Sequence, residues 1–379
     1  MSFNTLPTTT DSARTMTETP PRSTLRLAAV GDLLLTTRPN ATQAGRGLEA
    51  LSDEIRELFA GCDLVLANLE CTLTGADQVP TEPRVFASAS QIRGLAEAGI
   101  NLVTLGNNHA FDGGDLGFQT LKNQLDDLGI QACGAGLTLA DAARPVILEI
   151  KGLRIAVLAV VDGSSGMYRF ATHTTSGVAP FEMAALRHTL AELRQDVDHI
   201  IFTPHWGEER FRCPSPEQIA QARALIDAGA TLVLGHHPHV PQGMELYHNC
   251  PIAYSLGNFL ANDVYWDNGD VLTWNRFERT GCILLAELDQ AGVRSVQQIP
   301  VYDDGRVLSI DTSGRGERYL TRANRYLERG ITPVRYRLET LRVRTLLPIL
   351  TQLRWNKLRR LRPGHLRKAI RLFVRGIRP

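Results

Sequence analysis

The chain has 379 residues, of which 43% are hydrophobic and 21% charged, and its formal net charge is +1. This size suits one large α/β domain with an extension, or two modest domains. The six cysteines form no CxxC pair, which argues against a disulfide framework and against a cysteine-based zinc site. No apolar run approaches the ~20 residues of a membrane-spanning helix, and the N-terminus lacks the apolar stretch of a secretory signal.

Short apolar runs alternate with helical patterns along most of the chain. Residues 1–24 are rich in Thr, Ser and Pro and are predicted to form a disordered arm. Helices are predicted over residues 48–59, 88–98, 116–128, 181–193 and 216–228. Strands are predicted over residues 25–31, 63–67, 102–105, 154–161, 199–203, 231–234 and 252–255, with a hairpin between 282 and 301. This alternation favours an α/β domain over residues 25–310, with mainly parallel strands at its centre.

Polar residues that can bind metals follow five of the predicted strands. They are Asp32, then Asn68 and Glu70, then Asn107, Asn108 and His109, then His205, and finally His236, His237 and His239. In open α/β sheets, ligands bind at the carboxyl ends of the strands. If these five ends converge, they bring carboxylate, amide and imidazole groups to one point, and this donor set suits Mn, Fe or Zn.

Each of these segments also has a purely structural explanation. The residues after the first strand can form a turn, Asn68 to Glu70 a solvated loop, Asn107 to His109 a helix cap, and His205 a hydrogen-bonded core imidazole. The segment from 236 to 239 is different, because three imidazoles within four residues are seldom structural. The five segments together therefore predict a metal site.

Six motifs in this order resemble the bacterial capsule-synthesis CapA family, which takes part in poly-γ-glutamate capsule synthesis. The motifs are Val-Gly-Asp at 30–32, Asn-Leu-Glu at 68–70, Gly-Asn-Asn-His-Ala-Phe-Asp at 106–112, Pro-His-Trp-Gly-Glu-Glu at 204–209, Leu-Gly-His-His-Pro-His-Val-Pro-Gln at 234–242 and Tyr-Ser-Leu-Gly-Asn-Phe at 254–259. The resemblance extends from about residue 25 to about residue 301. It implies a calcineurin-like metallophosphoesterase fold, a four-layer αββα sandwich with the site at the strand ends.

The resemblance also implies a centre with two divalent metal ions (Mn, Fe or Zn). Asp32 and His239 would hold one ion, Asn108, His205 and His237 the other, and Glu70 would bridge them. The predicted catalytic residues are His109, as the acid that protonates a leaving oxygen, and Asp112. His236 is expected beside the ligands rather than among them.

Two positions depart from the phosphoesterase pattern. Leu34 stands where that pattern has a histidine two residues after the first aspartate, and Ala-Asn-Leu-Glu at 67–70 replaces the usual Gly-Asp motif. These departures predict that one metal is held weakly or is missing.

The motifs and their departures are compatible with two functions. The first is a metal-dependent hydrolase or transferase of capsule synthesis, acting on an anionic polymer such as poly-γ-glutamate or on a phosphoester. The second is a non-catalytic, polymer-binding accessory subunit of a capsule synthesis or export complex. Leu34 favours the second function, and the retained amide and histidine ligands favour the first.

The end of the chain has a different composition. Residues 311–379 are predicted to form a basic helical extension, in which ten basic and no acidic residues fall between Arg354 and Pro379. A helix over 353–379 with one apolar face predicts peripheral contact with an anionic membrane or docking of a polyanion, unless its basic face is simply solvated. Nucleic acid is not expected, since no aromatic residues interleave with the charges. We expect the protein in the cytoplasm or at the inner membrane face.

Overall fold

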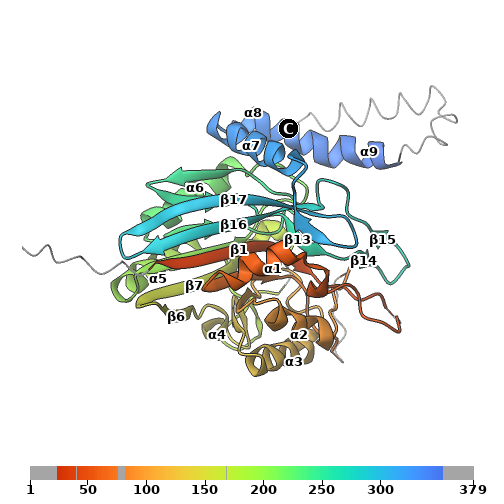
Figure 1. The fold of residues 1–379 in the computed structure, drawn as a ribbon, viewed down its shortest axis with the longest axis horizontal. Helices are drawn as coiled ribbons and strands as arrows, with labels where there is room; N and C mark the ends of the chain where they lie inside the picture. Colours follow the sequence, from red (N-terminus) through yellow and green to blue (C-terminus); the bar gives the residue numbers. More distant parts are fainter. Residues whose placement is uncertain (1–23, 40, 76–81, 168, 353–379) are drawn as a thin grey trace, which may run out of the picture.

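The computed structural model describes residues 24–39, 41–75, 82–167 and 169–352. The predicted N-terminal arm, Thr24 apart, and the predicted basic helix over residues 353–379 lie outside the described residues. Within the described part, two β-sheets pack together and helices cover their outer sides (Figure 1). No helix in the described ranges is long and apolar enough to cross a membrane.

The first sheet has eight strands. They are β1 (Leu25–Leu34), β2 (Leu64–Leu69), β3 (Leu102–Thr104), β4 (Gln131–Cys133), β13 (Asn258–Ala261), β16 (Thr280–Asp289), β17 (Gly292–Asp303) and β18 (Leu308–Ile310). Their order is β18-β17-β16-β1-β2-β3-β4, and β13 pairs with the end of β1. Strands β1 to β4 are parallel, whereas β16, β17 and β18 add an antiparallel wing. The β16–β17 pair confirms the predicted hairpin.

The second sheet has six strands. They are β6 (Val146–Ile150), β7 (Leu153–Val161), β9 (His199–His205), β10 (Leu232–Leu234), β11 (Met244–Tyr247) and β12 (Cys250–Ala253). Their order is β11-β12-β10-β9-β7-β6, with a parallel centre and an antiparallel strand at each edge. Two small ladders complete the described strands, β5 (Ala135–Gly136) with β8 (Gly177–Val178) and β14 (Val264–Tyr265) with β15 (Val271–Leu272).

Most predicted helices are confirmed. The helices over the sheets are α1 (Asp53–Ala60), α2 (Ala89–Glu97), α3 (Gly114–Asp127), α5 (Met183–Asp196) and α6 (Pro216–Asp227), and the short elements are η1 (Leu48–Ala50), α4 (Leu139–Ala142) and η2 (Gly163–Ser165). Ser88 and Ser215 cap α2 and α6 through capping boxes, which fixes where these two helices begin.

The single helix predicted over residues 48–59 is wrong, because the structure divides it into η1 and α1. Between them, Leu51 has an extended backbone and bridges to Leu308, and the amide of Ser52 donates to the carbonyl oxygen of Leu308. Pairing with β18 thus overrides a helical pattern of apolar residues.

Three apolar layers confirm the predicted αββα sandwich. Alternate residues of β1 face opposite ways, so that Leu25 and Leu27 enter the layer between the sheets while Ala28 and Val30 enter the layer under α1 to α3. The layer between the sheets also contains Val157 and Leu232 of the second sheet. A third layer packs the other face of the second sheet against α5 and α6. Such two-sided burial is why the parallel strands have nearly continuous apolar sequences.

Helices follow the last strand of the first sheet. They are α7 (Arg315–Glu328), α8 (Pro333–Leu341), the π-helical turn η3 (Arg342–Leu346) and α9 (Leu347–Gln352) (Figure 1). Asn324 of α7 accepts a hydrogen bond from the amide of Met244 in β11 and donates one to Gln298 in β17. Helix α7 therefore links β11, an edge strand of the second sheet, to β17 of the first sheet. The predicted domain boundary near residue 310 stays a prediction.

Candidate metal centre

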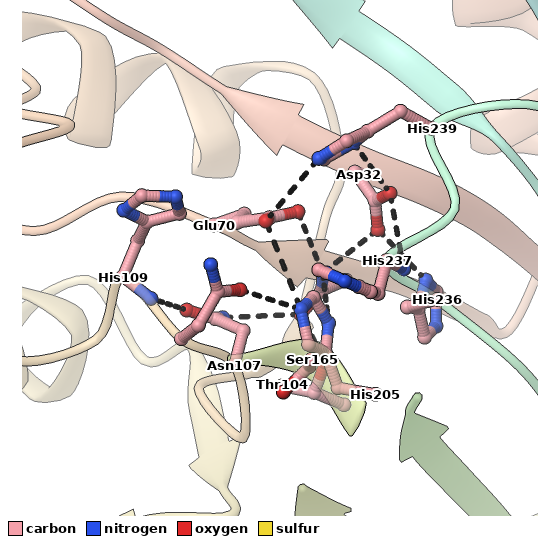
Figure 2. Close-up of polar contacts among 12 residues, drawn as sticks. Asp32, Glu70, Thr104, Asn107, His109, Ser165, His205, His236, His237 and His239 are labelled. Atoms are coloured by element: carbon pink, nitrogen blue, oxygen red, sulfur yellow. Dashed lines mark hydrogen bonds and ion pairs between the residues drawn. The ribbon is translucent and has the colours of Figure 1, made fainter. Parts of the chain in front are cut away.

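The five predicted strand ends meet at one edge of the sandwich. Asp32 lies on β1, Glu70 follows β2, Asn108 follows β3, His205 ends β9, and the 236–239 segment follows β10 (Figure 2). The backbone bridge between His205 and His236 continues the β9–β10 pairing of the second sheet, and His236 Nδ1 lies 3.2 Å from Asp32 Oδ1 of the first sheet. The structure thus brings all six predicted metal ligands together, although they lie on two different sheets.

One group of donor atoms belongs to Asp32, Glu70 and His239. Their donor atoms all lie within 4.8 Å of one another, and all three side chains are buried. His239 Nδ1 is 3.2 Å from Asp32 Oδ2, and His239 Nε2 is 3.7 Å from Glu70 Oε1. Two carboxylates and one imidazole therefore surround a single point.

A second group belongs to Glu70, His205 and His237, again with donor atoms within 4.8 Å of one another. His205 Nε2 lies 3.7 Å from Glu70 Oε1 and 2.7 Å from Asn108 Oδ1. The ring centroids of His205 and His237 are 4.8 Å apart. Because Glu70 belongs to both groups, its carboxylate lies between two candidate ion positions, with Asn108 beside the second.

Unpartnered buried atoms show that this donor set fits metal ions. Glu70 Oε1 and His237 Nδ1 are buried and have no hydrogen-bond partner among the described residues. Such atoms are rare in folded proteins and call for an unseen partner. His237 and His239 also have positive φ angles of 95° and 57°, a strained backbone that clusters at functional sites. Oxygen and imidazole nitrogen donors of this kind suit Mn, Fe or Zn.

The charges of the centre are unevenly distributed. Burial, together with the charge of Asp32, raises the pKa of Glu70 above its ordinary value. Burial alone would lower the pKa of His239, but the charge of Glu70 and a hydrogen bond to Asp32 raise it. Burial lowers the pKa of His237 to about 4 and also lowers that of His205. The latter two imidazoles are therefore neutral at physiological pH, the form that binds a metal.

Asn68 organises the carboxylate side of the centre. The sequence placed it among the residues that can bind metals, but its supporting role was not predicted. Its Nδ2 donates to Asp32 Oδ1 at 2.8 Å, and its Oδ1 accepts from Thr104 at 3.0 Å and from Asn107 at 3.1 Å. These bonds fix the amide, which in turn orients Asp32. In the sequence, the departure of residues 67–70 from the phosphoesterase motif could have drawn attention to Asn68.

Asn258 supports His239 in the same way and was also missed. Its Oδ1 accepts from His239 Nδ1 at 2.9 Å, and its Nδ2 donates to the carbonyl oxygen of Glu278. Asn258 pairs with Asp32 in the β13–β1 register, which places its side chain at the centre. The motif at 254–259 could have pointed to it, because Asn258 is the polar residue that begins the buried strand β13.

His236 and Leu34 also lie near Asp32, but only His236 has a side chain that could bind a metal. His236 Nδ1 lies 3.2 Å from Asp32 Oδ1, and His236 belongs to neither donor group. Leu34 is 2% exposed and packs in the apolar layer under α1 to α3. The position that is a histidine in the phosphoesterase pattern therefore offers no donor atom in this chain.

His109 and Asp112 form a pair at the rim of the centre. His109 Nδ1 lies 2.7 Å from Asp112 Oδ2, which also accepts a hydrogen bond from the amide of Val85. The side chain of His109 is 14% exposed and that of Asp112 is 1% exposed. Burial alone would lower the pKa of His109, but the charge and hydrogen bond of Asp112 raise it. The imidazole is thus oriented and partly open to solvent, on the Glu70 side of the centre (Figure 2).

Solved structures with a similar fold are distant in sequence. The NAD nucleotidase of Haemophilus influenzae matches with a TM-score of 0.45 and 16% identity, covering 79% of this chain and 62% of that one. A hypothetical protein of Thermus thermophilus matches with a TM-score of 0.44 and 18% identity, covering 74% of this chain and 100% of that one. These similarities concern the fold alone.

Sequence relatives are more informative. The chain is 28% identical over 281 residues to the PGA biosynthesis protein CapA of Bacillus subtilis, covering 73% of this chain and 71% of that protein. It is 31% identical over 210 residues to a probable polyglutamine synthesis accessory protein of Mycobacterium tuberculosis, covering 52% of this chain and 55% of that protein. Residues 26–263, more than half of the chain, match the family of the bacterial capsule synthesis protein PGA_cap. The chain therefore belongs to this capsule synthesis family, as its motifs indicated.

Proposed function

We propose that this chain is a metal-dependent hydrolase or transferase of poly-γ-glutamate capsule synthesis. One observation carries the proposal. Two buried groups of donor atoms share Glu70, and an oxygen of that shared carboxylate has no hydrogen-bond partner among the described residues. A shared carboxylate between two imidazole-bearing groups is the arrangement expected of a centre for two divalent ions.

Each of the two ions would take ligands from both sheets. Asp32, Glu70 and His239 would hold one ion, and Glu70, His205, His237 and Asn108 the other. When bound, such ions polarise a carbonyl or phosphoryl oxygen and lower the pKa of water. Asn68 and Asn258 keep Asp32 and His239 in position through the hydrogen bonds described above.

The His109–Asp112 pair supplies a proton in this proposal. Asp112 holds the imidazole through Nδ1, which leaves Nε2 to face a substrate. The same carboxylate favours the protonated ring, as a general acid requires. We infer that His109 protonates the leaving group of a γ-glutamyl amide or a phosphoester.

Elemental analysis of the purified protein tests the proposal. We expect about two metal equivalents in the wild type and a marked loss in His237→Ala, whereas His173→Ala, an exposed histidine elsewhere, keeps both. The metal-loaded protein is then assayed on γ-glutamyl amides and phosphoesters, with His109→Ala as the catalytic variant. Absence of metal in the wild type, even after reconstitution with Mn and Zn, would overturn the proposal.

A second candidate is a non-catalytic accessory subunit that binds the polymer. Leu34 favours it, because this buried apolar residue removes a ligand position of the phosphoesterase pattern. A relative from Mycobacterium tuberculosis also carries the name of an accessory protein. This candidate predicts binding of poly-γ-glutamate without turnover, even when the metal content reaches two equivalents.

A further inference from the structure

Two adjoining cavities open beside α7, away from the metal ligands. Their volumes are about 450 and 500 Å³, and both are lined by Arg276, Phe277, Tyr319 and Arg322. We call the combined cavity the basic groove, because its lining carries a row of guanidinium groups. They belong to Arg212, Arg276, Arg315, Arg318 and Arg322.

Most of this positive charge has no ion-pair partner in the part of the chain that the structure describes. Among the described residues, no carboxylate lies within ion-pair distance of Arg276, Arg315, Arg318 or Arg322. The two acids in the lining are already engaged. Asp311 accepts hydrogen bonds from the amides of Ser313 and Gly316, and Glu339 pairs with Arg342. A concave surface with unpaired charges of one sign attracts the opposite charge.

Aromatic rings hold part of this charge in place. The guanidinium carbons of Arg212 and Arg276 lie 4.2 and 4.6 Å from the ring centroid of Phe277. The ring of Tyr319 lies 6.2 Å from that of Phe277. A guanidinium over a ring keeps its N–H edge available for a carboxylate, and its position is fixed before a ligand binds. Two cations on one ring also repel each other, and a bound anion would relieve this repulsion.

The remaining arginines form a row along one helix. Arg315, Arg318 and Arg322 are three and four residues apart on α7, so they share one face. Their spacing along the helix axis is about 4.5 and 6 Å. A row of this kind matches a chain with repeated anionic groups better than a single compact anion.

Two loops connect the basic groove to the candidate metal centre. The ring of Trp274, three residues before Phe277, lies 5.2 Å from that of His239. Glu278 forms an ion pair at 2.6 Å with Arg210, and the amide of Arg210 donates to the carbonyl oxygen of Pro238. The groove is therefore attached to the same loops that carry the histidine ligands.

We propose that the basic groove binds the carboxylates of an extended polycarboxylate chain while another part of that chain reaches the metal centre. The nature of the polymer rests on the proposed function, whereas the site itself rests on the arginines and aromatic rings. The groove would act as a subsite that holds the polymer without taking part in bond cleavage.

The test compares the affinity of full-length variants for a γ-linked glutamate oligomer. Arg276→Gln, Arg318→Gln and Arg322→Gln are combined in one groove variant. The control combines Arg93→Gln, Arg187→Gln and Arg306→Gln, three exposed arginines elsewhere with the same total change of charge. We expect a loss of roughly tenfold in the groove variant, as three partly exposed ion pairs would give, and little change in the control. Circular dichroism and thermal unfolding confirm that both variants fold.

Hydrogen exchange then locates the oligomer. We expect protection over residues 274–280 and 315–323 in the wild type, which binding elsewhere on the chain would not produce. In His237→Ala this protection persists, so that a failure of the metal centre and a failure of the groove give different results. Equal loss of affinity in the groove and control variants would overturn the proposal. So would tighter binding of polyphosphate or an oligonucleotide than of the glutamate oligomer.

Discussion

The two sheets contribute different chemistry to the metal centre. The first sheet supplies the carboxylates of Asp32 and Glu70 and the amide of Asn108, whereas the second supplies the imidazoles of His205, His237 and His239. The two carboxylates and the three imidazoles are buried, and a buried charge without a partner is costly. The carboxylates become tolerable only when the second sheet docks and brings the imidazoles. The centre therefore forms only where the two sheets meet. Variants on each sheet should show how much its residues contribute to metal binding and to stability.

Glu70→Gln should have the largest effect, because this carboxylate belongs to both donor groups. We expect the metal content to fall from about two equivalents to none after dialysis, as measured by elemental analysis. The metal-free variant should be at least as stable as the wild type in urea unfolding, since burial and the charge of Asp32 already disfavour the ionised carboxylate of Glu70. Glu97→Gln, on the exposed side of α2, serves as the control. Two bound equivalents in Glu70→Gln would refute the bridging role.

His239→Ala and His205→Ala compare the two groups directly. Each should reduce the metal content by about one equivalent, but their metal-free stabilities should differ. His239 balances the charges of Asp32 and Glu70, so its removal should cost about 3–5 kcal/mol of unfolding free energy. His205 is neutral, so its removal should cost less. If both variants lost the same unfolding free energy in urea without metal, His239 and His205 would not differ in charge as described.

Asn68→Ala tests the support of the carboxylate side. Asn68 orients Asp32 without belonging to either donor group, so we expect a loss of metal affinity of about 10–100-fold. Isothermal titration with Mn or Zn measures this change, and Asn101→Ala, at an exposed asparagine directly before β3, is the control. An unchanged affinity would mean that Asp32 is positioned by its backbone alone.

The layers, and the clustering of the candidate donor residues, could be predicted from the sequence for a definite physical reason. Parallel strands buried on both faces have apolar runs, and the first polar residue after each run marks the edge where ligands gather. His237 and Glu70 could be placed by this rule together with the family motifs. Helix α5 and the β16–β17 hairpin followed from their apolar periodicity alone.

The features that the sequence did not predict share one cause. Each depends on contacts between segments that are distant in the sequence. The β-bridge of Leu51 to Leu308 splits a helix that local periodicity predicts as continuous. Asn68 and Asn258 became visible as supports only when their partners from other strands were in place. The basic groove escaped detection too, since Arg276 and Arg318 belong to segments that meet only after folding.

Asp311→Ala should have the smallest effect of these variants. Asp311 lies just before α7, away from the metal ligands. It accepts hydrogen bonds from Ser313 and Gly316 and so holds the start of α7, the helix that links β11 to β17. We expect a loss of about 1 kcal/mol in unfolding free energy near neutral pH, with metal content unchanged. Thermal and urea unfolding of the metal-free proteins measure the difference.

The pH dependence of that difference separates a charged contact from simple packing. Burial alone would raise the pKa of Asp311, but hydrogen bonds from Ser313 and Gly316 lower it in the folded protein. A group whose pKa falls on folding stabilises the protein above its unfolded pKa, about 3.9 for aspartate. The difference between wild type and variant should therefore be full above about pH 4 and shrink as the pH falls further through the folded pKa. A difference that persists at lower pH would mean that Asp311 supports α7 by its shape rather than by its charge.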